Sequence, residues 1–113
     1  MKIEIRIDDL SSEESQSIVR EHMAGMLANT PIESVHALPL EKLRKPSISF
    51  WTAWTGETVC GCGALQMLDP HHGEVKSMRT RANFLRQGIG PAVLSHIINE
   101  ANTRSEEHTS ELQ

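Results

Sequence analysis

The residues of this chain best suited to chemistry form a short glycine-bearing loop, Leu85-Arg86-Gln87-Gly88-Ile89-Gly90, that leads into an apolar helical segment. A diphosphate needs several N–H donors that converge on one point without side chains in the way. The first amides of a helix have no intrahelical acceptor, and the helix dipole adds partial positive charge there. Gly88 and Gly90 keep the approach open. The pattern therefore predicts that this loop binds the phosphates of a coenzyme.

Together with the preceding segment, Glu74-Val75-Lys76-Ser77-Met78-Arg79-Thr80, the loop resembles the central motif of the Gcn5-related N-acetyltransferases (GNAT). That motif is written R/Q-x-x-G-x-G/A and lies between a strand and a helix. The wider phrase GEVKSMRT…FLRQGIG is similar to a subgroup of small bacterial acetyltransferases. The resemblance covers nearly all of residues 1–103, because the early strand and helix and the paired strands around C-G-C-G-A-L agree as well.

The resemblance implies an enzyme that transfers an acetyl group from acetyl-CoA to an amine of a small molecule or peptide, without a metal. In that family the strand before the loop pairs through its backbone with the pantetheine arm. The positions implied to bind acetyl-CoA are Ser77, Met78, Thr80, Arg86, Gln87, Gly88, Ile89, Gly90 and Ala92.

Two positions depart from the family pattern. Leu85 stands where the family usually has Arg or Gln, although Arg86 and Gln87 follow it directly. Pro91 has no N–H, so one phosphate donor is missing, although proline is well tolerated in the first turn of a helix. We expect weakened cofactor binding from these two changes. The alternative is a loop whose glycines only make a tight turn. Rossmann and P-loop sites fit worse, because neither G-x-G-x-x-G nor G-K-[ST] is present.

Acetyl transfer needs a deprotonated amine, so a general base near the acetyl carbonyl would help. Glu74, at the start of the strand, is the candidate, because family members place a carboxylate or an ordered water in this region. His71 and His72 in the preceding turn are alternatives with suitable unperturbed pKa values. Each of the three is otherwise an exposed turn residue.

Two cysteines and two tryptophans complete the set of candidates. Cys60 and Cys62 are two apart on an expected strand, so they should share one face. Two sulfurs without a second pair make a poor zinc site, and we expect both to be structural. Trp51 and Trp54 are three apart and should face opposite sides. One is expected in the core, and the other could line a substrate cleft.

Hydrophobic periodicity places these residues on an α+β fold with a mostly antiparallel sheet flanked by helices. The segment over residues 2–7 is expected to form a strand with Ile3, Ile5 and Ile7 on its buried face. It precedes a helix over 12–28 that starts with a Ser11–Glu14 capping box and ends at Asn29-Thr30-Pro31. The further expected elements are a weaker helix over 34–44, strands over 48–54, 58–67 and 74–81 with turns at 55–57 and 69–73, and a helix over 91–102. The run of small residues Cys60-Gly61-Cys62-Gly63-Ala64 predicts that another element packs closely against the strand over 58–67. Val93, Leu94, Ile97 and Ile98 are expected to hold this last helix on the sheet.

Composition excludes several classes. The 113 residues suffice for one domain, and 38% hydrophobic and 23% charged residues are typical of a globular protein. A net charge of −4 without a basic stripe argues against a nucleic-acid surface. No apolar run is long enough to span a bilayer, and the N-terminus lacks a signal-peptide pattern. We therefore expect a cytoplasmic protein. A homodimer is a further expectation.

The last ten residues, RSEEHTSELQ from Arg104 to Gln113, match the in-frame translation of a common sequencing-library adapter. We therefore expect an N-acetyltransferase domain over residues 1–103 and a non-native tail over 104–113. The family fold usually continues after the last helix with a further strand, helix and hairpin, and that helix often supplies a tyrosine as general acid. This chain has no tyrosine. We expect a fragment that is inactive or nearly so, with an unpaired edge on the strand over 74–81.

Two other function classes remain open at this point. The chain could be a non-catalytic module that binds acyl-CoA or a small ligand, having kept the sheet and lost the chemistry. It could also be a subunit-interaction domain without a ligand.

Overall fold

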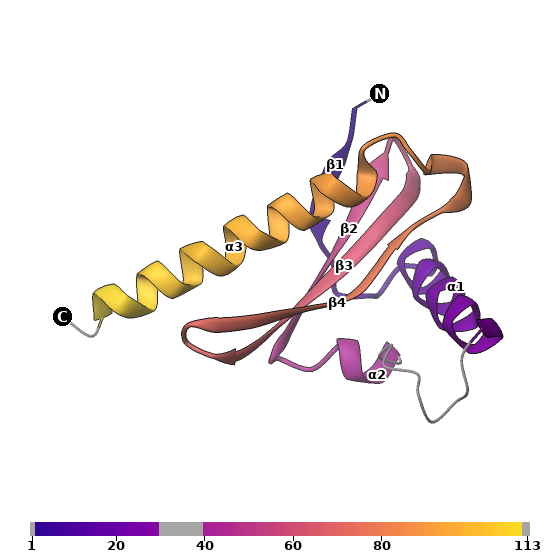
Figure 1. Cartoon of the computed structure of the whole chain (residues 1–113). Coiled ribbons are helices and arrows are strands. Elements are labelled where there is room, and N and C mark those ends of the chain that lie inside the picture. The colour runs from indigo at the N-terminus through magenta and orange to yellow at the C-terminus, as the bar shows by residue number, and fades with distance from the viewer. Residues whose placement is uncertain (1, 30–39, 112–113) are drawn as a thin grey trace.

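The computed structural model describes residues 2–29 and 40–111. A four-stranded antiparallel sheet in the order β1-β2-β3-β4 forms its centre, with helices α1 and α2 on one face and α3 on the other (Figure 1). This confirms the expected α+β class. The elements are β1 (Glu4–Ile7), α1 (Glu13–Asn29), α2 (Leu40–Leu43), β2 (Ile48–Thr55), β3 (Thr58–Asp69), β4 (His72–Thr80), a 3-10 turn (Ala82–Phe84) and α3 (Ile89–Glu111).

The two faces of the sheet carry separate hydrophobic clusters, and each cluster belongs to different helices. The cluster that packs against α1 and α2 consists of Leu10, Ile18, Val19, Leu43, Phe50, Trp54, Val59, Cys62 and Ala64. The cluster that packs against α3 consists of Trp51, Ala53, Cys60, Leu65, Ile89, Val93 and Ile97. The two tryptophans therefore lie on opposite faces, as predicted, and both are buried.

The cysteines do not share a face, so that prediction was wrong. Trp54 pairs with Val59, whereas Ala53 pairs with Gly61, so β3 has one extra residue between these two pairs. That extra residue is Cys60. Because one inserted residue shifts the alternation of a strand, Cys60 packs on the α3 face and Cys62 on the α1 face. Among the described residues no group of three or more His, Cys, Asp or Glu side chains could hold a metal ion.

Helix α1 begins one residue later than the capping box predicted. Ser12, not Ser11, is the N-cap: its hydroxyl accepts a hydrogen bond from the backbone N–H of Ser15 at 3.2 Å. The hydroxyl of Ser15 in turn donates to Asp8, whose carboxylate also accepts from Thr52 Oγ1 at 2.8 Å. This buried network joins the end of β1, the start of α1 and the middle of β2.

Strand β1 is only partly buried. Ile3 and Ile5 pack against the α3-side cluster as predicted, but Ile7 is 69% exposed. The expectation that all three isoleucines are buried was therefore wrong for Ile7, which ends the edge strand β1 and lines an open hollow beside β1 and β2.

The hairpins match the predicted turns with small shifts. Gly56, with φ of +61°, lies in a two-residue turn between β2 and β3. The second turn is shorter than the expected 69–73, since β3 ends at Asp69 and β4 begins at His72. Of the weaker helix expected over 34–44, the described part is α2, and residues 34–39 lie outside the described residues.

Helix α3 is longer than predicted at both ends, running from Ile89 to Glu111 instead of 91–102. It starts earlier because the carbonyl of Gly88 accepts the first helical hydrogen bond, from Ala92 N–H at 3.1 Å. It ends later because residues 104–111 continue it. Arg104, inside the segment predicted to be non-native, lies 3.2 Å from Glu100 and donates to Ser49 Oγ at 2.9 Å. The origin of that segment stays a prediction.

Candidate cofactor and acyl-transfer site

The segment that joins β4 to α3 begins with a fixed turn. The N–H of Arg81 donates to Cys60 O at 2.9 Å, and Phe84 N–H donates to Arg81 O at 2.9 Å. Further along this segment, Arg86 and Gly88 have positive φ angles, of +63° and +84°. A Cβ built on Gly88 would meet no atom within 4 Å. The loop therefore presents an exposed, side-chain-free stretch of backbone directly before the helix.

The amides of this loop are open. Among the described residues, no protein acceptor takes a hydrogen bond from the N–H groups of residues 86–90. Pro91 has none to offer, and Ala92 N–H is the first in the helix with a partner, Gly88 O. Free amides at the start of a helix, where the dipole is positive, favour an anion. The loop thus has the donors that phosphate binding requires.

Helix α3 is held close to the sheet, which fixes the position of these amides. Ile89, Val93 and Ile97 are buried at its contact with the sheet. Leu94 and Ile98 are 40% and 47% exposed, so the prediction that they also hold the helix was wrong. Ile98 instead lines a hollow between α3 and the β3–β4 hairpin.

Two glycines of β3 allow this close approach, as the run of small residues predicted. A Cβ on Gly61 would lie 2.6 Å from Ile89 Cγ2, and one on Gly63 would lie 2.5 Å from Met78 Sδ and 2.8 Å from Ile97 Cδ1. These distances are below any normal contact, so a larger residue at either position requires the side chains of α3 and β4, or α3 itself, to shift.

The residues predicted to contact the pantetheine arm lie on β4, which pairs with β3 alone among the described strands. Its other edge is free, as predicted. Lys76 pairs with Ala64 and Arg79 with Cys62, so β4 has one extra residue between these pairs. Ser77 lies in this bulge with φ of +54°, its carbonyl accepts from Cys62 Sγ at 3.2 Å, and its buried hydroxyl has no partner. Gly90, at the start of α3, faces Thr80: a Cβ there would lie 3.5 Å from Thr80 Oγ1. The structure therefore brings the end of β4 and the loop together.

The acid–base candidates lie at the other end of β4, next to the β3–β4 hairpin (Figure 1). Glu74 is half-exposed, with a carboxylate oxygen 3.4 Å from Lys76 Nζ. His72 Nδ1 lies 2.8 Å from Asp69, and this hydrogen bond lowers the pKa of the Asp69 carboxyl. Glu74 and Thr80 are six positions apart, which is about 20 Å along a strand. The role of Glu74 as base stays a prediction.

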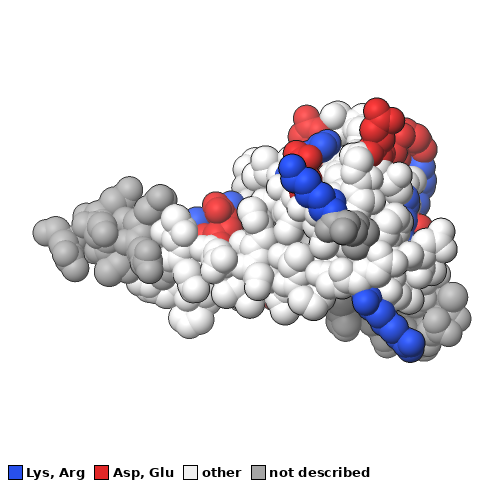
Figure 2. All heavy atoms as spheres, turned by 90° about the horizontal axis from the view of Figure 1, so that it is seen from above, with Lys and Arg blue, Asp and Glu red and all other residues white. Residues whose placement is uncertain are grey.

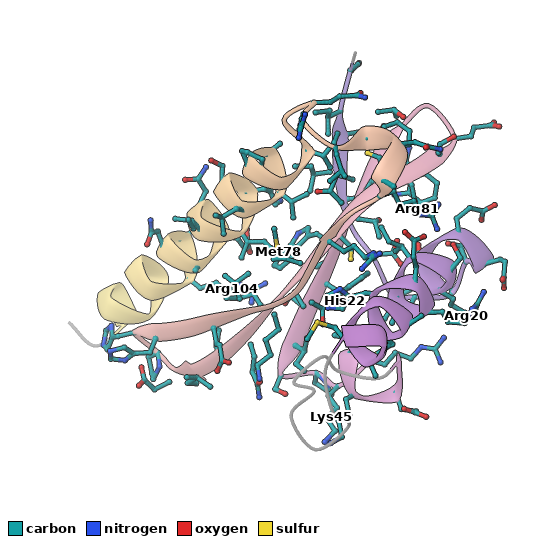
Figure 3. All side chains as sticks on the ribbon, turned by 45° about the vertical axis from the view of Figure 1, so that its right-hand side comes forward. Arg20, His22, Lys45, Met78, Arg81 and Arg104 are labelled. Carbon is teal, nitrogen blue, oxygen red and sulfur yellow. The ribbon has the colours of Figure 1, made fainter. Side chains whose placement is uncertain are left out.

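A group of charged side chains under α1 was not singled out from the sequence. Arg79 and Arg81 both extend from the β4 end towards Glu21 of α1, with Nε–carboxylate distances of 3.5 and 3.2 Å. His22 lies beside them, and burial first, then the charge of Arg79, lower its pKa. Figure 3 shows His22 on the side of α1 that faces the strands and Arg20 on the side that faces away. The period-two spacing of the arginines was the signal that could have revealed this group.

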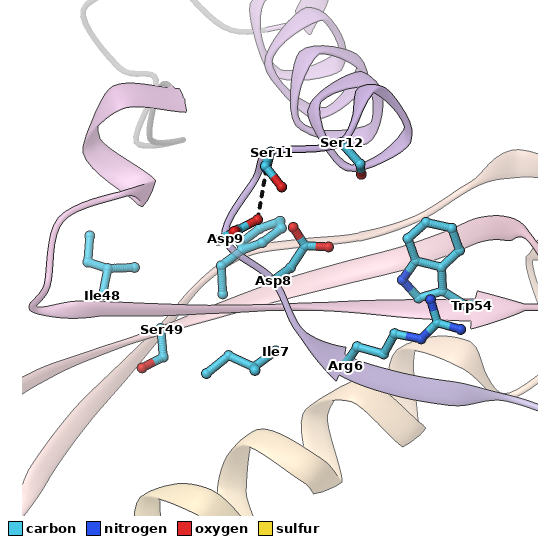
Figure 4. A pocket seen from close by; sticks show the side chains of 10 residues that line it. Arg6, Ile7, Asp8, Asp9, Ser11, Ser12, Ile48, Ser49 and Trp54 are labelled. Carbon is cyan, nitrogen blue, oxygen red and sulfur yellow. Dashed lines mark hydrogen bonds between the residues drawn. The ribbon is translucent and has the colours of Figure 1, made fainter.

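Two hollows lie elsewhere on the described surface. One of about 700 Å³ lies beside β1 and β2 and includes Arg6, Asp9 and Trp54 in its wall (Figure 4). The guanidinium of Arg6 lies 4.8 Å from the centre of the Trp54 ring. The other, of about 240 Å³, lies between the β3–β4 hairpin and α3. None of the predicted cofactor residues lines either hollow.

Comparison with known proteins identifies the family. The sequence matches the acetyltransferase (GNAT) family over residues 11–112. An uncharacterized N-acetyltransferase of Bacillus subtilis, YsnE, is 54% identical over 106 residues, which are 94% of this chain and 70% of YsnE. The chain belongs to the GNAT family. The uncharacterized N-acetyltransferase YedL of Escherichia coli is 48% identical to it over 88% of this chain and 63% of YedL. The chain therefore spans about two thirds of these GNAT relatives.

The GNAT fold is also found among solved structures. The PaiA N-acetyltransferase of Thermoplasma acidophilum, crystallised in complex with coenzyme A, superposes with a TM-score of 0.68 at 17% identity. The match covers 92% of this chain and 74% of that one. At this level of identity the likeness concerns the fold, and it confirms the predicted antiparallel sheet with flanking helices. No helix in the described residues is both long and apolar enough to cross a membrane.

Proposed function

We propose that this chain carries the donor site of an N-acetyltransferase that moves an acetyl group from acetyl-CoA to an amine of a small molecule or peptide. The observation that carries the proposal is the row of open amides over residues 86–90, at the positive end of α3. In the proposal these amides hold the diphosphate, and the side chains of Arg86 and Gln87, both exposed, add to them. Ile89 and Ala92 hold the start of the helix in place.

The free edge of β4 suits the other part of the donor. Its unpaired backbone groups around Ser77, Met78 and Thr80 can pair with the amide groups of the pantetheine arm, as a neighbouring strand would. Met78 contributes its backbone, because its side chain packs towards Gly63 on the α3 face. The bulge at Ser77 interrupts the regular pairing and so marks where the thioester would lie.

In the transfer step the amine nitrogen forms a bond to the thioester carbon, the C–S bond breaks, and the thiolate takes up a proton. The attacking nitrogen loses a proton, for which Glu74 is our proposed acceptor. To act, Glu74 must leave its ion pair with Lys76. We expect slow turnover by the 113-residue chain, because β4 alone would form a one-sided slot for the arm. Substantial acetyl transfer by the purified chain would contradict this expectation without affecting the binding proposal.

A titration of acetyl-CoA tests the donor site. Gly88→Trp places a bulky side chain among the open amides, and we expect at least about tenfold weaker binding from the loss of one or more charge-assisted bonds. Gly56→Trp is the matched control, since Gly56 also has positive φ and open space around it but lies in the β2–β3 turn. Equal binding by both variants, or no binding by the unchanged chain, would contradict the proposal.

The alternative of binding without transfer is favoured by one observation, the half-exposed and ion-paired state of Glu74. Release of free thiol in the presence of a panel of amines separates the two functions. Thiol release above the rate of hydrolysis favours the enzyme, and binding without release favours the module.

We further propose that the protein acts in the cytoplasm on a small-molecule amine and has neither a nucleic acid nor a membrane as partner. The net charge of −4 supports this. On the face shown in Figure 2, most of the surface is uncharged, and the lysine and arginine side chains do not gather into a continuous basic patch. A homodimer stays a prediction that sedimentation would test.

A further inference from the structure

Arg79 lies on the face of the sheet opposite the donor loop, the segment over residues 85–90 that is proposed to bind the phosphates of acetyl-CoA. It pairs with Cys62, which belongs to the cluster that packs against α1, and side chains of paired residues share a face. The open amides belong instead to the start of α3, on the other face. The guanidinium of Arg79 therefore cannot serve the phosphates of acetyl-CoA. It is available to a second ligand that approaches from the α1 side.

The guanidinium of Arg79 has donors to spare. Its Nε lies 3.5 Å from Glu21, and within the described part of the chain its two terminal nitrogens donate to no protein acceptor. Arg81 differs, since it donates to Val59 O and to the hydroxyl of Ser17. One carboxylate, that of Glu21, thus faces two guanidinium groups. The surplus of positive charge and of free N–H groups belongs to Arg79, whose side chain is 29% exposed.

Helix α1 makes room for this guanidinium. A Cβ on Gly25 would lie 2.6 Å from Arg79 Nη1, so glycine allows the charged tip to rest against the helix. His22, one turn earlier, is half-buried, and the charge of Arg79 favours its neutral form. The guanidinium therefore lies between α1 and β4, against Gly25 and near the carboxylate of Glu21.

Arg79 lies close to the proposed point of acyl transfer. Arg79 is two residues from the bulge at Ser77, where the free edge of β4 would hold the thioester. With the donor phosphates on the α3 side, the α1 side is the one left for an acceptor. A planar guanidinium with free N–H groups matches a carboxylate in two-pronged geometry.

We propose that the acceptor amine carries a carboxylate and that Arg79 binds it, so that the substrate class is amino acids and related acidic amines. This inference rests on the proposed N-acetyltransferase function. Arg79 is a specificity-determining residue in this account.

Calorimetric titration of matched pairs tests the inference on the 113-residue chain. The probes are glycine, leucine and phenylalanine, each against its amide, which retains the amine and lacks the carboxylate. We expect at least one acid to bind about tenfold or more tightly than its amide, from one charge-assisted bidentate contact. Arg79→Gln should reduce the ratio to about one. Arg20→Gln, an exposed α1 arginine that faces away from the sheet, should leave it unchanged.

A second variant keeps the test decisive if Arg79→Gln does not fold. Gly25→Ala retains the charge but displaces the guanidinium tip, which is flexible, and should lower the ratio severalfold. Equal binding of acids and amides by the unchanged chain, an undiminished preference in Arg79→Gln or in Gly25→Ala, or no binding by any probe would overturn the inference. Acetyl-CoA binding is measured separately. Its loss would refute the proposed donor site, whereas its presence without acid preference would refute only the role of Arg79.

Discussion

Replacing Gly63 by alanine is the substitution whose outcome the structure determines most sharply. The new Cβ would lie 2.5 Å from Met78 Sδ, 2.8 Å from Ile97 Cδ1 and 2.9 Å from Val93 Cγ1. Val93 and Ile97 are buried at the contact between α3 and the sheet, so neither can move without moving the helix. Overpacking of this kind costs about 1–3 kcal/mol.

The backbone effect has the opposite sign but is smaller. Alanine in place of glycine in a strand stabilises by roughly 0.5–1 kcal/mol. We therefore expect Gly63→Ala to lower the free energy of unfolding by about 1–2 kcal/mol, and the melting temperature by about 4–8 °C for a domain of this size. Urea denaturation followed by circular dichroism measures the first quantity, and a thermal melt the second.

Gly25→Ala is the matched control, because a Cβ there would also come within 2.6 Å of another atom. That atom is the tip of the Arg79 side chain, which can rotate away. We expect this variant to be more stable by up to about 1 kcal/mol, as alanine is the better helix former. Equal stabilisation by the two substitutions would refute the view that the glycines of β3 fix the position of α3.

Three further predictions concern single side chains. Burial raises the pKa of the Cys62 thiol to about 12, so iodoacetamide at pH 8 should modify Cys62 only in urea; rapid labelling of the native chain would show that it is accessible. Because the folded pKa of His22 is lowered, the unfolded chain takes up the proton first, and its contribution to stability is present above about pH 6.5 and lost as the pH falls further. His22→Gln should flatten the urea midpoint against pH over this range, and an unchanged slope would contradict the burial of His22. Ser77→Ala removes a buried hydroxyl without a partner, so the free energy of unfolding measured in urea should stay unchanged or rise by up to about 1 kcal/mol. A lower free energy of unfolding would show that the hydroxyl has a stabilising partner.

The sequence predicted the fold correctly where a local requirement determines the residue type, as in tight turns and at close contacts between elements. The turn at Gly56 was predictable because glycine readily adopts the positive φ it needs there. The small residues Gly61 and Gly63 correctly indicated a close neighbour. Gly88 correctly indicated a loop before α3, because its φ of +84° is a conformation that glycine readily adopts. That this loop binds phosphate stays a prediction.

The failures have a common physical origin in irregular pairing and long-range contact. The extra residue at Cys60 reverses the alternation of β3, and no feature of the sequence marks which residue is inserted. The exposure of Ile7 depends on how the sheet is assembled, with β1 at its edge and an open hollow beside it. The contact of Arg79 with Gly25 joins residues far apart in the chain, so only the packed structure revealed it.

Chemical shift changes in the ¹H–¹⁵N spectrum on addition of coenzyme A test the central claim most directly, because they report on each amide separately. The account predicts the largest changes at the amides of Gln87, Gly88, Ile89 and Gly90, with smaller ones along β4 from Ser77 to Thr80. The amide of Gly56, equally exposed to solvent in its turn, should not move. Changes confined to other parts of the chain, or none at saturating coenzyme A, would contradict the claim that the open amides at the start of α3 hold the phosphates.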